Sequence, residues 1–258
     1  MEYKKAPISE VVCGIFVPES VFSIDDISRL NVLFITEYPQ SEILHPIFLE
    51  MYRKNPADGK FQTMHLVPAN STTAFLYRRF SKDNDYLIQF QENCFYLNWI
   101  RQDNQDVGNY PGFVNVYKMF TKELEKACSV KPIGISDGQV FELNYTDRVP
   151  LHYADGRIRK IEDCLNISLP AIIGQNSADK INLRYTIEEK ELNGSGFLEV
   201  STDCDQTGME LLEFRYIIRG EFSSKMFSSR DLWFSKAHDR QKEVFETSFK
   251  NSAKEEWK

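Results

Sequence analysis

The stretch from Asp85 to Phe120, DYLIQFQENCFYLNWIRQDNQDVGNYPGFVNVYKMF, constrains the fold of this chain more than any other. Apolar and polar residues alternate on both sides of Glu92-Asn93, which is the pattern of a β-hairpin. Side chains alternate across a strand, and cross-strand partners share a face. A turn at Glu92-Asn93 therefore places three apolar pairs on one face: Tyr86 with Trp99, Ile88 with Leu97, and Phe90 with Phe95.

The other face of this hairpin is polar and carries Gln89, Gln91, Tyr96 and Asn98. A slip of the pairing by one residue would bury the amides, so the register is well specified. Amides and a phenol on a rigid sheet suit the recognition of another molecule's polar groups. We therefore take these four as candidate binding residues. An ordinary solvated sheet face is the alternative.

Amphipathic helices are predicted at three places. After the hairpin, Pro111 suits a first helical turn, and an apolar stripe follows at helical spacing. This stripe contains Phe113, Val116, Tyr117, Phe120, Leu124 and Cys128. An earlier helix is capped by Ser23 and directs Ile24, Ile27, Leu30 and Phe34 inward. A long helical stretch over 231–257 places Phe234, Ala237, His238, Gln241, Phe245 and Phe249 on one face.

The remaining apolar runs predict strands. They cover 11–17, 42–53, 64–67, 74–80 and 139–149, and then a meander over 180–188, 196–202 and 210–222. The sequence thus predicts an α+β protein in which antiparallel sheets are packed by amphipathic helices. Residues 1–150 and 151–258 form either two similar lobes, each with strands before a helix, or one compact unit.

Composition narrows the classes of partner and the compartment. The chain has 258 residues and a formal net charge of −7, and its densest basic blocks are Arg78-Arg79 and Arg157 to Lys160. Nucleic-acid binding is therefore disfavoured. The five cysteines are widely separated and form no C-x-x-C pair. The N-terminal apolar run is too short for a signal peptide or a membrane span. We expect a soluble cytoplasmic protein.

Several elements, in order, resemble a sporadically distributed, uncharacterised bacterial family of about this length. They are Ala6, Pro7, Ile8, Glu10 and Val12; Gln89, Gln91, Asn98 and Trp99; Tyr110, Pro111 and Phe120; Leu143, Tyr145, Arg148 and Val149; and His238 and Phe245. Asn144 and Asp147 depart from the family's arginine and asparagine, and the C-terminal end is shorter. The resemblance implies a bacterial cytoplasmic protein of unknown activity, from mobile gene sets in which defence and toxin–antitoxin roles are common. It supplies no catalytic residues.

His238 is the strongest single candidate for a reactive or ligand-binding group, because it lies on the apolar face of its predicted helix. The alternative is a core histidine bonded to a main-chain carbonyl or to a tyrosine or asparagine. Glu142, Asp147 and His152 add a possible divalent-metal set for hydrolysis, although Glu142 and Asp147 should point to opposite faces of one strand. No nucleotide-binding, serine-hydrolase or zincin motif occurs.

The sequence therefore favours a non-catalytic interaction protein with a protein partner, including self-association, and with no cofactor, metal or membrane. Its candidate binding residues are Gln89, Gln91, Tyr96, Asn98 and His238. A metal-dependent hydrolase or nuclease that uses His152, His238, Glu142 and Asp147 is one alternative. Another is a small-molecule binder with a pocket between sheet and helices.

Overall fold

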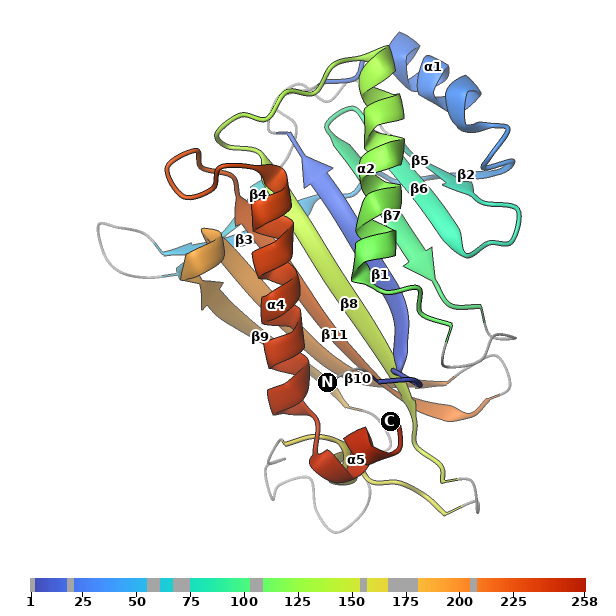
Figure 1. Ribbon diagram of the computed structural model, residues 1–258, viewed down its shortest axis with the longest axis vertical. Coiled ribbons are helices and arrows are strands. Elements are labelled where there is room, and N and C mark those ends of the chain that lie inside the picture. Colours follow the sequence, from blue (N-terminus) through green and yellow to red (C-terminus); the bar gives the residue numbers. More distant parts are fainter. Residues whose placement is uncertain are drawn as a thin grey trace.

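The computed structural model describes residues 3–17, 21–54, 61–66, 75–102, 109–153, 157–166, 181–204 and 208–258, and of residues 52–54, 61 and 64–66 the main chain only. These residues form one nine-stranded antiparallel sheet, a separate two-stranded hairpin and five α-helices (Figure 1). This arrangement agrees with the predicted α+β class. None of the helices in the described ranges is long and apolar enough to cross a membrane.

The large sheet places the first strand of the chain in its middle. In spatial order its strands are β2 (Gln40–Leu44), β5 (Leu76–Phe80), β6 (Tyr86–Gln91), β7 (Cys94–Ile100), β1 (Ile8–Phe16), β8 (Val140–Pro150), β11 (Glu210–Glu221), β10 (Gly194–Cys204) and β9 (Asn182–Glu189). Strand β8 pairs with β1 on one side and with β11 on the other. The sheet is therefore continuous across residue 150, where the two predicted lobes would meet.

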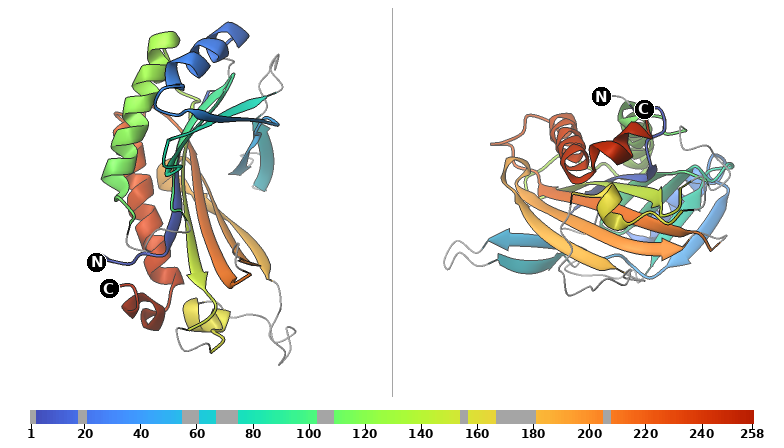
Figure 2. Two further views of the ribbon diagram at one scale, coloured as in Figure 1. Left: turned by 90° about the vertical axis from the view of Figure 1, so that its right-hand side faces the viewer. Right: turned by 90° about the horizontal axis from the view of Figure 1, so that it is seen from below.

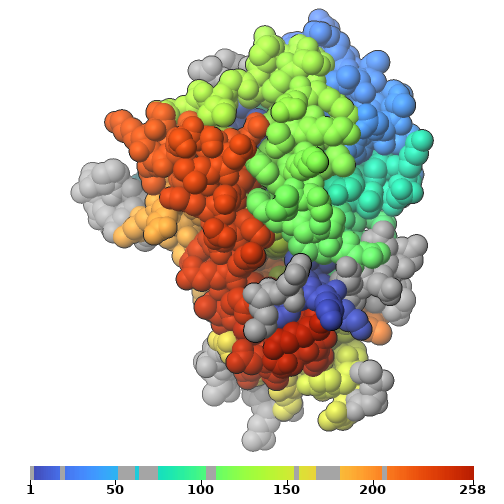
Figure 3. Space-filling model, in the orientation of Figure 1, coloured from blue at the N-terminus to red at the C-terminus, as the bar shows by residue number. Residues whose placement is uncertain are grey.

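The long helices cover one face of this sheet. They are α1 (Ile24–Phe34), α2 (Phe113–Val130) and α4 (Arg230–Ser248), and α2 and α4 lie side by side across the molecule (Figure 3). Phe120 of α2 packs against Phe95 of β7 at 6.4 Å between ring centroids and against Phe234 of α4 at 5.4 Å. We call this side of the sheet the helix face. Two short helices, α3 (Ile161–Cys164) and α5 (Asn251–Glu255), lie together near the chain ends.

The predicted hairpin is confirmed, including its register. Strands β6 and β7 pair Tyr86 with Trp99, Ile88 with Leu97 and Phe90 with Phe95. The last four of these residues are fully buried in the core under the helices. Because the hairpin is local and one of its faces is apolar, alternation alone determines which residues it buries.

A second, smaller core lies on the opposite side of the sheet, which we call the open face. The separate hairpin, β3 (Leu49–Lys54) and β4 (Phe61–Leu66), lies over this face (Figure 2). Leu49 and Met51 of β3 pack there with a cluster of buried sheet residues. This cluster consists of Val12, Phe16, Cys94, Tyr96 and Val140. The open face is therefore partly covered by the chain's own hairpin.

Several predicted boundaries are wrong, each for a local or tertiary reason. The strand expected over 42–53 divides into β2 and β3 around Pro46, which has no N–H to donate to a ladder. Ile24 is 59% exposed instead of facing inward. Gly112, with φ of 87°, precedes α2, so Pro111 lies outside the helix. The apolar segment 166–173, in which Pro170 indicates a strand edge or a bend, lies outside the described residues except for Asn166.

The C-terminal helix predicted over 231–257 is two helices. Phe249 is extended, with φ of −91° and ψ of 140°, and forms a bridge with Leu165. Its side chain is fully buried, so tertiary contact outweighs helix continuation at this position. The chain then turns into α5, and Lys5 N–H donates to the Trp257 carbonyl at 2.9 Å, which holds the two ends of the chain together.

Candidate functional site

The four polar hairpin residues lie on the open face, as alternation predicted, but most of them are not available to a partner. Gln91 is 2% exposed, Tyr96 2% and Asn98 4%, and only Gln89 is half-buried. Gln91 bonds to the main chain of Ile47 in both directions, at 2.9 and 3.0 Å. Its amide thus fixes the segment that leads into β3.

Tyr96 is buried because its ring lies against Gly14 of the neighbouring strand. A Cβ atom at Gly14 would come within 2.0 Å of the Tyr96 ring. Close approach of an aromatic ring to the main chain requires glycine here. On the same face, Gln89 donates to Asn98 at 2.9 Å, and Asn98 donates to Glu10 at 2.6 Å. These amides therefore link β6, β7 and β1 to one another.

An ion pair that sequence analysis missed lies at the centre of the open face. Arg219 Nε donates to Glu142 Oε2 at 2.8 Å, and both side chains are largely buried. The carboxylate of Glu142 raises the pKa of Arg219 against the opposing effect of burial. Arg219 also donates to the Glu50 carbonyl at 3.0 Å, which ties β3 to the sheet. Residues Glu142 and Arg219 are direct cross-strand partners, so only the β8–β11 register could have revealed the pair.

Toward the other end of the open face, half-exposed charges form a ladder across four strands. It consists of Arg148, Glu213, Arg215, Glu199 and Arg184, joined by ion pairs of 3.1, 3.3, 3.7 and 3.3 Å. Arg184 also pairs with Glu50 at 2.8 Å, so the three arginines are balanced by three glutamates and neither sign is in surplus. Such a surface is solvated and rigid, and it shows no preference for an anionic or a cationic partner.

His238 lies on the helix face, away from the four hairpin residues. Its Nδ1 lies 3.0 Å from the Tyr145 hydroxyl, which lies 2.9 Å from the Tyr110 hydroxyl. The imidazole stacks on Phe113 with 4.1 Å between ring centroids. Burial, followed by the nearby Lys242 ammonium, lowers the pKa of His238 to about 4. His238 is half-buried, and its hydrogen bond to Tyr145 is of the kind expected in the alternative of a core histidine.

We expect the free energy of unfolding of His238→Gln to fall less at acidic pH than that of the wild-type protein. Folded His238 stays neutral between about pH 6.5 and about pH 4, whereas in the unfolded chain it takes up a proton. The wild-type free energy of unfolding therefore decreases as the pH falls through this window, by about 1–2 kcal/mol from this group. Thermal unfolding of both proteins across the window measures the difference, with His152→Gln as control. Parallel curves for wild type and His238→Gln would contradict the assignment.

The four residues of the hydrolase alternative are not brought together. Glu142 is on the open face with Arg219, and Asp147 and His238 are on the helix side. His152 lies beyond the end of β8, with Nε2 4.0 Å from Glu210. Within the described residues there is no group of three or more histidine, cysteine or acidic side chains placed to hold a metal ion.

Asp147 is nevertheless unusual. It is 3% exposed, pairs with Phe214 across β8 and β11, and its Oδ1 has no hydrogen-bond partner. Burial, only partly offset by Arg101, raises the pKa of Asp147 to about 8. A carboxylic acid in these surroundings stays protonated at neutral pH.

The candidate binding residues therefore do not form one site. Gln91, Tyr96 and Asn98 are buried on the open face, and His238 is hydrogen-bonded on the helix face. Comparison of the chain with protein-family models, with curated proteins and with solved structures finds no match.

Proposed function

We propose that this chain is a non-catalytic protein-binding protein that takes up an extended segment of a partner at strand β2. The observation that carries the proposal is the exposure of this end strand. All five residues of β2 are exposed, with Ile43 at 60% and Leu44 at 41%. One side of β2 pairs with β5, and in the described part of the chain no strand pairs with its other side. An end strand of this kind offers main-chain N–H and C=O groups to an added strand.

The contrast with the other end of the sheet supports β2 as the binding edge. Native proteins usually protect end strands with charged side chains. Strand β9 follows this rule with Arg184 and Glu188, whereas β2 has one charged residue, Glu42, which pairs with Arg78 at 3.4 Å.

Exposed apolar side chains also occur on the helix that precedes β2 in the chain. Val32 in the last turn of α1 is 72% exposed, and Ile35 directly after it is 51% exposed. They add to the apolar surface that neighbouring segments of the chain expose.

The chemistry of the edge specifies the partner segment. It is extended, because it adds to a sheet, and it carries apolar side chains at alternate positions to contact Ile43 or Leu44. A net charge of −7 on this chain favours a basic segment and works against a second acidic copy in the same place. A second copy of this chain, bound through its own β2, is the alternative occupant of the β2 edge.

The proposal predicts that Ile43→Lys abolishes partner capture while Ile158→Lys does not. Ile158 is 70% exposed but lies beyond β8, so it controls for the added charge. Tagged proteins are used for affinity capture from the native host, and purified complexes are analysed by mass photometry and hydrogen exchange. We expect slower exchange at the β2 amides in the wild-type complex. A partner that Ile43→Lys still captures, or a homodimer as the only complex, would refute the proposed mode.

We also infer that the two halves of the chain arose by duplication. The first half runs β1, α1, outer strands, β7 and α2, and the second runs β8, α3, outer strands, β11 and α4. In both halves the first strand lies at the sheet centre and the last strand lies beside it.

All five cysteines are free thiols, which supports a reducing bacterial cytoplasm as the setting. A defence or toxin–antitoxin role would fit a partner-binding protein of this kind.

A further inference from the structure

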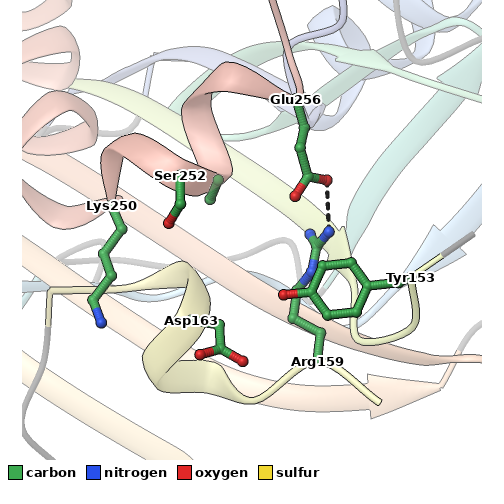
Figure 4. A pocket seen from close by; sticks show the side chains of 7 residues that line it. Tyr153, Arg159, Asp163, Lys250, Ser252 and Glu256 are labelled. Atoms are coloured by element: carbon green, nitrogen blue, oxygen red, sulfur yellow. Dashed lines mark hydrogen bonds and ion pairs between the residues drawn. The ribbon is translucent and has the colours of Figure 1, made fainter. Parts of the chain in front are cut away.

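A pocket of about 290 Å³ lies where the segment after β8 meets the two short helices (Figure 4). This end of the molecule is far from β2 (Figure 1). The pocket is lined by Tyr153, Arg159, Asp163, Lys250, Ser252, Ala253 and Glu256. The helix break at Phe249 creates it, because Lys250 N–H donates to the Cys164 carbonyl at 2.8 Å and holds α5 beside α3. The pocket is at the lower end of the size range for ligand sites, so a ligand would be small.

Arg159 forms a fixed wall of this pocket. It is 6% exposed, its guanidinium lies 4.3 Å from the centroid of the Tyr153 ring, and Nη2 contacts Glu256 Oε2 at 2.6 Å. Its Nε is buried without a hydrogen-bond partner. The Arg159 guanidinium is therefore held by the protein's own Glu256 and Tyr153, and it forms a cationic side of the pocket.

The opposite side of the pocket holds further polar side chains that can still form hydrogen bonds or ion pairs. Across the residues that the structure describes, neither the Lys250 ammonium nor the Ser252 hydroxyl has a hydrogen-bond or ion-pair partner. Asp163 accepts the Lys160 N–H through Oδ2 at 3.1 Å, which leaves its second oxygen available. Figure 4 shows Lys250 and Ser252 on one side, Arg159 and Tyr153 on the other, and Asp163 between them.

We propose that this pocket binds a small zwitterion of the free amino-acid class. Its charged lining residues are two cations, Arg159 and Lys250, and two anions, Asp163 and Glu256. A ligand that carries both charges matches this balance, whereas a bare phosphate would have to lie beside two carboxylates. The ligand carboxylate is bound by Lys250 and Ser252, and its ammonium by Asp163.

The test is calorimetric titration of the full chain with the standard L-amino acids, and with acetate, ethylammonium and inorganic phosphate as single-charge probes. We expect at least one amino acid to bind with a Kd below about 1 mM, and each single-charge probe to bind at least about tenfold more weakly. Lys250→Gln and Asp163→Asn should each weaken amino-acid binding by about tenfold or more, because each removes one charge-assisted bond.

Matched controls keep the result interpretable. Lys242→Gln and Asp239→Asn remove the same charges from exposed positions on α4, outside the pocket, and should leave the Kd unchanged. The side-chain oxygen of asparagine at position 163 can still accept the Lys160 N–H, so Asp163→Asn should fold. Phosphate binding tighter than any amino acid, no amino acid binding below about 10 mM, or unchanged affinity in both pocket variants would each overturn the proposal. None of these outcomes bears on β2, which lies elsewhere in the fold.

Discussion

Replacing Asp147 by asparagine is expected to stabilise the protein, and to do so increasingly as the pH rises from about 4 to about 8. In the folded protein the Asp147 carboxyl is 3% exposed and its Oδ1 has no partner, so burial raises its pKa to about 8 from an ordinary 3.8. Between these values the unfolded chain releases the proton and the folded chain keeps it. The wild-type free energy of unfolding therefore falls as the pH rises through this window.

The size of this effect follows from linkage. Each pH unit within the window contributes at most about 1.4 kcal/mol, so the full gain of the asparagine variant at alkaline pH amounts to about 3–5 kcal/mol. Urea unfolding at several pH values measures the slope for wild type and for Asp147→Asn. Asp25→Asn, at an exposed position on α1, is the control. The same slope in wild type and Asp147→Asn would show that Asp147 is not protonated in the fold.

Glu142→Ala is expected to lower the free energy of unfolding by about 3–5 kcal/mol, because it leaves the buried Arg219 guanidinium without its carboxylate. The same truncation at an exposed pair is the matched control. Glu42→Ala removes a partner of Arg78 at 3.4 Å, where the side chains are 51% and 26% exposed, and should cost less than about 1 kcal/mol.

The double variant Glu142→Leu with Arg219→Met distinguishes the charge effect from lost packing. It removes both charges and retains side-chain volume, so it should recover much of the loss seen in Glu142→Ala. Chemical unfolding followed by tryptophan fluorescence reports all four proteins. A double variant no more stable than Glu142→Ala would show that packing, rather than the unpaired charge, sets the cost.

The parts of the fold that could be predicted from sequence are those in which neighbouring residues determine the structure. The β6–β7 register follows from alternation around Glu92-Asn93, and Ser23 and the periodic apolar residues place α1. The position of β1 between β7 and β8 depends on residues far along the chain, and no local pattern specifies it. The break at Phe249 likewise depends on Leu165, a distant partner.

The candidate site was predicted less well than the fold, for the same physical reason. Alternation placed Gln91 and Tyr96 on the correct face, but their burial comes from Ile47 and Gly14, which belong to other elements. Similarly, periodicity placed His238 on an apolar helix face, whereas its partner Tyr145 comes from β8. Periodicity gives the face of a residue, and only tertiary contacts give its exposure.

The central position of β1 also determines when this molecule can become stable during synthesis. Strand β1 is made before the other strands of the sheet, yet it pairs with β7 and β8, so its core residues Val11 and Cys13 stay uncovered until β8 has been translated. Contacts between residues far apart in the sequence form slowly, and an unpaired apolar strand is prone to aggregate while it waits. We therefore expect a ribosome-bound nascent chain that ends before β8 to depend on chaperones, and one that extends past Pro150 to depend on them less.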